Sequence, residues 1–72
     1  MNNSFKLLDV VALTVNLPEY GLRRGQVGTI VEILKPNVYE IEFSDEDGQA
    51  YNFKALTEDQ LMHLYYNYLK AA

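Results

Sequence analysis

The segment LRRGQVGTIVEIL, residues 22–34, joins two arginines to a Gly-x-x-Gly spacing and then to a run of β-branched residues. A P-loop needs four residues between its glycines, followed by Lys and Ser or Thr, and a dinucleotide fingerprint needs a third glycine that opens a helix. The Gly-x-x-Gly loop of a KH domain joins two helices, whereas Gly28 lies inside the β-branched run. The pattern therefore favours a bent β-strand. Gly25 supplies a positive φ where a loop ends, and Gly28 avoids a steric clash at the bend.

Strand patterns continue on both sides of this segment. Residues 9–15, DVVALTV, are rich in β-branched residues and alternate with a period of two. Residues 16–25 contain one proline and two glycines, which predicts a long loop. Residues 26–34 form the second predicted strand. This strand is apolar on both faces towards its end, as expected where it passes through the core of a closed sheet.

Two further strands follow a turn predicted at residues 35–37. Residues 38–43, VYEIEF, alternate, so that the two aromatic side chains and the isoleucine point to one side and the glutamates to the other. Asp47–Gly48 is a strong hairpin signal. Residues 50–56, AYNFKAL, are then the fourth strand.

The C-terminal segment supports two interpretations. Thr57 and Gln60 have the spacing of a capping box, and apolar residues recur after them at helical intervals: Leu61, Leu64, Tyr65, Tyr68 and Leu69. The same segment also alternates with a period of two, and a five-stranded barrel needs one more strand to close its edge. We expect a single helical turn at residues 57–60 and a strand over residues 61–66, with a C-terminal helix as the alternative.

This order of elements predicts an all-β protein, a small five-stranded SH3-like barrel with a short helical turn near the C-terminus. The alternative is four strands followed by a C-terminal helix. A chain of 72 residues without cysteine holds one small core, so we expect one domain over residues 1–72. Residues 1–5 and 69–72 are expected to be frayed.

Composition narrows the classes of partner. Ten acidic and six basic side chains give a net charge of −4, which repels phosphate backbones and anionic membranes. The N-terminal segment lacks the basic start and cleavage site of a signal peptide, and the longest uncharged stretch, Val10–Pro18, is far shorter than a membrane span. The composition therefore disfavours nucleic-acid partners, and no membrane segment is expected.

The sequence also resembles known families. RRGQVGTIVEI resembles the turn and strand of KOW-type barrels in translation proteins, some of which bind RNA. Over residues 6–64, including DVVALTVNLPEYGLRRGQVGTIVE and YEIEFSDEDG, the chain is similar to a family of short, stand-alone bacterial proteins known as a domain of unknown function. The resemblance implies a barrel and a cytoplasmic bacterial protein, and it assigns no catalytic or binding residue.

The long loop carries the first candidate binding site. Arg23 and Arg24 follow Tyr20, and an aromatic ring beside guanidinium groups can stack a base or bind a carboxylate. Loops on a rigid scaffold are common positions for binding residues. The structural explanation, which the sequence favours for these two arginines, is that both pair with the acidic hairpin around Asp45.

The aromatic tail is the second candidate site. Tyr65, Tyr66 and Tyr68 lie close together with Leu64 and Leu69, which is more than one buried face can absorb. We therefore expect exposed apolar area there and a homodimer that forms through it.

Other residues favour structural explanations. His63, the single histidine, is expected on the surface, because no serine stands in a nucleophile context. Asp45, Glu46 and Asp47 lack the spacing of an EF-hand and are expected to form a solvated hairpin tip. Glu40 and Glu42 are spaced for the wet face of a strand. No catalytic residue, metal site or cofactor is predicted.

The sequence thus favours a non-enzymatic protein-interaction module of unknown partner, which could neutralise or regulate a neighbouring bacterial protein. The alternative is an RNA- or ribosome-associated barrel of the KOW kind, which the negative charge opposes.

Overall fold

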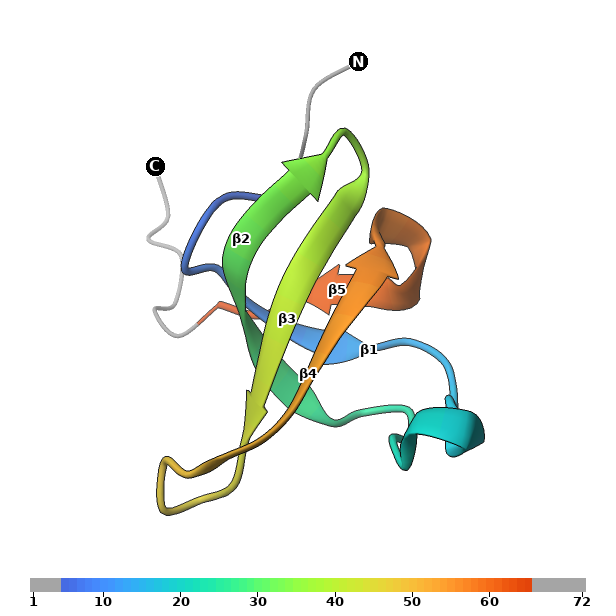
Figure 1. Cartoon of the computed structure of the whole chain (residues 1–72), viewed down its shortest axis with the longest axis vertical. Helices are drawn as coiled ribbons and strands as arrows, with labels where there is room; N and C mark the ends of the chain where they lie inside the picture. The colour runs from blue at the N-terminus through green and yellow to red at the C-terminus, as the bar shows by residue number, and fades with distance from the viewer. Residues whose placement is uncertain (1–4, 66–72) are drawn as a thin grey trace, which may run out of the picture.

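A computed structural model describes residues 5–65 of the chain (Figure 1). It contains five strands, β1 (Val10–Leu13), β2 (Val27–Lys35), β3 (Val38–Ser44), β4 (Ala50–Thr57) and β5 (Leu61–His63). Two short 3₁₀ turns, η1 (Pro18–Tyr20) and η2 (Glu58–Gln60), lie before β2 and between β4 and β5. The prediction of an all-β fold with a helical turn before the last strand is confirmed. No helix within residues 5–65 is long and apolar enough to cross a membrane.

The strands form one antiparallel sheet in the order β4-β3-β2-β1-β5. Within the described residues β4 and β5 are not paired, so the predicted closure into a barrel is wrong for the hydrogen-bonded ladder. The physical reason is the length of β5, which spans three residues and uses them to pair with β1. Figure 1 shows β1 and β5 crossing the direction of β3 and β4, so that the sheet curls without closing.

β2 bends because it pairs with two different neighbours. Its first residues pair with β1, from Ala12↔Val27 to Val10↔Thr29, while the pairing with β3 runs from Gly28↔Phe43 to Lys35↔Val38 with two register shifts. At Gly28 an added Cβ would lie 2.6 Å from Ile41 Cγ2 and 2.9 Å from the backbone oxygen of Glu42. The prediction that Gly28 avoids a clash at this bend is confirmed.

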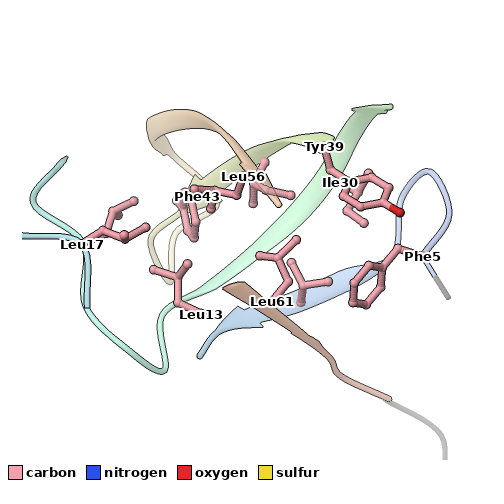
Figure 2. Close-up of a cluster of buried hydrophobic side chains, with 11 residues drawn as sticks. Phe5, Leu13, Leu17, Ile30, Tyr39, Phe43, Leu56 and Leu61 are labelled. Carbon is pink, nitrogen blue, oxygen red and sulfur yellow. The ribbon is translucent and has the colours of Figure 1, made fainter. Parts of the chain in front are cut away.

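The hydrophobic core lies inside the curl of the sheet (Figure 2). The alternation predicted for β3 is confirmed, because Tyr39, Ile41 and Phe43 are fully buried. Phe5, which the sequence analysis placed in the frayed N-terminal end, packs edge-on against Tyr39 with ring centroids 5.6 Å apart. The core residues are Phe5, Val11, Leu13, Leu17, Leu22, Ile30, Tyr39, Ile41, Phe43, Leu56 and Leu61. The other residues expected to fray, 1–4 and 69–72, lie outside the described residues.

The last part of β2 differs from its prediction. Val31, Ile33 and Leu34 are 36%, 40% and 44% exposed instead of buried on both faces. β1 pairs with β2 no further than Thr29, and the last contact on that side is the hydrogen bond from the Leu8 N–H to the Ile30 carbonyl at 2.8 Å. Beyond that point, within residues 5–65, β3 is the strand paired with β2.

Candidate binding site

The loop between β1 and β2 holds Arg23 and Arg24 through their backbone. The Arg23 N–H donates to Gln26 Oε1 at 2.6 Å, and the Arg24 N–H donates to Asn16 Oδ1 at 2.9 Å. The next residue, Gly25, has a φ of 94° and donates its N–H to the Leu13 carbonyl at 2.8 Å. Both arginines are therefore fixed in position while their guanidinium groups stay available.

Within residues 5–65 neither guanidinium group takes part in an ion pair. The acidic hairpin uses its own backbone instead, because Asp45 Oδ1 accepts the N–H groups of Asp47 and Gln49 at 2.9 and 3.0 Å. The predicted pairing of the two arginines with this hairpin is therefore absent from residues 5–65.

Tyr20 joins the loop to β4. It ends the turn η1, and Gly21 follows it in a left-handed conformation with a φ of 71°. The Tyr20 carbonyl accepts a hydrogen bond from Asn52 Nδ2 at 3.0 Å. The Lys54 ammonium lies over the Tyr20 ring, 4.6 Å from its centroid, in a cation–π contact. A third cation thus lies beside the loop that carries the two arginines.

Tyr51 of β4 extends this surface and is 48% exposed. Phe53 is 51% exposed, but it pairs with Glu42 and so lies on the face of β4 away from the core. The Tyr51 hydroxyl accepts a hydrogen bond from Gln26 Nε2 at 2.8 Å, so the side chain that anchors Arg23 also contacts β4. We call the set the loop–β4 surface: Tyr20, Arg23, Arg24, Tyr51 and Lys54.

The sequence analysis predicted the loop half of this surface and missed the β4 half. The signal for the missing half was the aromatic residue Tyr51 and the cation Lys54 in the predicted strand AYNFKAL. Nothing local indicated that the strand would lie beside the loop.

An open hollow of about 580 Å³ adjoins the arginines and is lined by Asn16, Pro18, Gly21, Leu22 and Arg23. Leu22 is itself buried and gives the hollow an apolar base. Arg23 therefore borders a concave, partly apolar space, which suits a side chain of a partner better than a flat surface does.

His63 is a second group of interest and differs from its prediction as a surface residue. Its Nε2 lies 2.9 Å from Asp9 Oδ2, and the two side chains are 23% and 15% exposed. The imidazole lies between Phe5 and Tyr65, with ring centroids 5.9 and 4.4 Å away. The pair ties the start of β1 to β5, which explains why the histidine is half-buried.

Asp9 and Tyr39 have perturbed pKa values. Burial alone would raise the pKa of Asp9, but the hydrogen bond from the Lys6 N–H at 2.8 Å and the His63 side chain together hold it below the usual value. Burial, followed by the nearby Glu58 carboxylate, raises the pKa of Tyr39, so its hydroxyl stays protonated at neutral pH. Both effects belong to groups that hold the fold together.

The other candidate residues are the glutamates of β3, groups that could bind a metal ion and the tyrosines of the C-terminal tail. Glu40 and Glu42 are half-exposed on the face of β3 opposite the core, as expected. Residues 5–65 contain no group of three acidic, histidine or cysteine side chains arranged for a metal ion. Tyr65 is 74% exposed, whereas Tyr66 and Tyr68 lie outside the described residues.

Comparison with known proteins adds one finding. The model of a family described as "Domain of unknown function (DUF4926)" matches residues 7–63, which include all five strands and the whole β1–β2 loop. No curated protein and no solved structure matches the chain.

Proposed function

We propose that this chain, which belongs to the DUF4926 family, is a non-enzymatic protein-interaction module that binds an acidic segment of another protein through its loop–β4 surface. The observation that carries the proposal is the state of Arg23 and Arg24. Both are exposed and fixed by side-chain amides, and neither is paired within the described residues, although the chain has ten acidic side chains.

The chemistry of the surface suits carboxylates. A guanidinium group binds a carboxylate through two parallel hydrogen bonds, and such charge-assisted bonds are stronger than neutral ones. Arginine and tyrosine are also the residue types that carry most of the binding energy in protein interfaces. Because the backbone around Arg23 and Arg24 is already held, little ordering of the loop remains to be done on binding.

The overall charge favours a protein partner over RNA. A net charge of −4 repels a polyphosphate backbone along most of the surface, whereas a short acidic segment needs to approach one cationic patch. The proposed setting is the bacterial cytoplasm, where the chain would neutralise or regulate the protein that it binds. The absence of cysteine agrees with a reducing compartment.

Affinity capture tests the proposal. The tagged full chain is used to capture partners from a lysate of its own source, with and without nuclease, next to the variants Arg23→Glu and Lys35→Glu. Lys35 ends β2, is exposed and lies outside the loop–β4 surface, so it controls for the change in charge. We expect a protein that survives nuclease, is lost with Arg23→Glu and is retained with Lys35→Glu.

Two results would contradict the proposal. Loss of all captured protein after nuclease would favour the RNA-associated alternative. Equal capture by the Arg23→Glu and Lys35→Glu variants would show that the partner binds elsewhere.

A further inference from the structure

β4 lies at one edge of the sheet with its outer backbone open. In residues 5–65 the strand paired with it is β3, from Val38↔Thr57 to Ser44↔Ala50. Backbone hydrogen bonds outside the ladders do not reach residues 51–56. At the far end the Thr57 N–H donates to Gln60 Oε1 at 3.0 Å, which closes that position. The open edge is therefore residues 51–56.

This edge has little of the protection that sheet edges usually carry. Natural proteins block free edges with charges, prolines, bulges or covering segments. The open stretch, YNFKAL, contains no proline, and its one charge is Lys54, whose ammonium lies over the Tyr20 ring. A register shift affects its first residue, between Phe43↔Asn52 and Ser44↔Ala50. Within residues 5–65, β4 is the end strand of the sheet order and β3 is the strand paired with it.

The loop that carries the two arginines contacts the same strand. Gln26 joins the Tyr51 hydroxyl of β4 to the backbone N–H of Arg23 through hydrogen bonds of 2.8 and 2.6 Å, and Asn52 joins β4 to the Tyr20 carbonyl. An extended segment placed along β4 would therefore lie beside this loop, in which Arg23 and Arg24 are exposed. Such a segment gains main-chain hydrogen bonds from the edge and specificity from its side chains.

A second copy of the chain is a poor occupant for this edge. Two symmetry-related edge strands pair in antiparallel fashion, so the hairpin of one copy, residues 45–47, would meet Glu58 and Asp59 of the other. Like charges would then face each other at both ends of the pair. An acidic segment from another protein avoids this repulsion, because it can end before the acidic residues and direct its carboxylates at the cationic loop.

Resting on the proposed function, we propose that the partner supplies an acidic, extended segment that pairs with residues 51–56 of β4 as a sixth strand. Its backbone bonds to the open edge, and its carboxylates bind Arg23 and Arg24. The exposed rings of Tyr51 and Phe53 then lie against the added strand.

A random dodecapeptide library selected against the full chain provides the probe. We expect selected peptides to be rich in Asp and Glu and to shift the backbone amide resonances of residues 51–56. A selected peptide is then made with single N-methyl groups at successive positions. Because alternate N–H groups of a strand face the same neighbour, N-methylation should weaken binding about tenfold at every second position and much less at the positions between.

The outcomes separate this inference from the proposed function. Similar effects at successive positions, with shifts confined to residues 20–26, would overturn the strand pairing and leave the acidic interaction in place. Replacement of the peptide's Glu by Gln without loss of affinity, together with unchanged binding by Arg23→Glu, would overturn the proposed function as well. A library that yields no peptide shifting the β4 amides also overturns the strand pairing.

Discussion

Replacement of Gly28 by alanine tests how tightly the bend of β2 is packed. The new Cβ would lie 2.6 Å from Ile41 Cγ2, 2.9 Å from the Glu42 backbone oxygen and 3.0 Å from Phe43 Cδ1. Ile41 and Phe43 are fully buried, and the Glu42 oxygen belongs to the neighbouring strand of the ladder. None of these atoms can rotate into solvent to relieve the contact, so the strands themselves must separate.

The size of the effect follows from two opposing contributions. The φ of Gly28 is not among the positive ones, so alanine adopts its conformation and gains about 0.4–1 kcal/mol from the unfolded state. Overpacking a buried site costs about 1–3 kcal/mol. We expect Gly28→Ala to destabilise by roughly 1–2 kcal/mol and Gly28→Val by more, because valine adds two methyl groups at the same place.

Urea unfolding followed by far-ultraviolet circular dichroism measures this difference. Thr29→Val is the matched control, since Thr29 is half-exposed, neighbours Gly28 in the same strand and keeps a β-branched side chain. The control should change the free energy of unfolding by less than about 0.5 kcal/mol. A Gly28→Ala variant as stable as the control would refute the steric account of the bend.

Three further predictions concern the loop, the Asp9–His63 pair and the tail. Gly25→Ala should cost about 1 kcal/mol although its Cβ would meet no atom within 4 Å, because the φ of 94° is strained for alanine; unchanged urea unfolding would contradict this. The pKa of Asp9 is held low in the folded state, so its contribution to stability is present above the usual carboxyl pKa and is lost as the pH falls through the lower folded value. Asp9→Asn should flatten the acid limb of stability against pH and cost about 1 kcal/mol at pH 7, and an unaltered limb would exclude this role. Sedimentation at tens of micromolar should find a dimer that a chain ending at Leu64 no longer forms; a full-length monomer whose mass and thermal stability survive the truncation would exclude the tail contact.

The fold was predictable where the decisive interactions are local. The period-two pattern of β3, the Asp47–Gly48 hairpin and the capping-box spacing of Thr57 and Gln60 all lie within a few neighbours in sequence, and each predicted its element. The predicted burial of the end of β2 was wrong, because its apolar pattern is equally consistent with burial and with exposure. The length of β1 decides between burial and exposure, because β1 pairs with β2 no further than Thr29.

The same distinction explains the candidate site. Tyr20, Arg23 and Arg24 stand together in one loop, so composition was enough to select them. Lys54 reaches Tyr20 through the curl of the sheet, across more than thirty residues of sequence, and no local pattern records that contact. His63 was misjudged for the same reason, because its partner Asp9 lies at the other end of the chain.

The negative charge of the rest of the chain makes the cationic loop the favoured point of approach for an acidic segment. The chain carries −4 overall, so an acidic segment would be repelled by the average field and attracted to the loop that carries Arg23 and Arg24 and has the Lys54 ammonium over its Tyr20 ring. At physiological salt such fields extend about 8 Å, roughly the reach of the side chains themselves, so the attraction acts during the final approach. In the proposed complex, repulsion elsewhere would orient the acidic segment along the side of β4 nearest the loop, so that few contacts would set one binding direction.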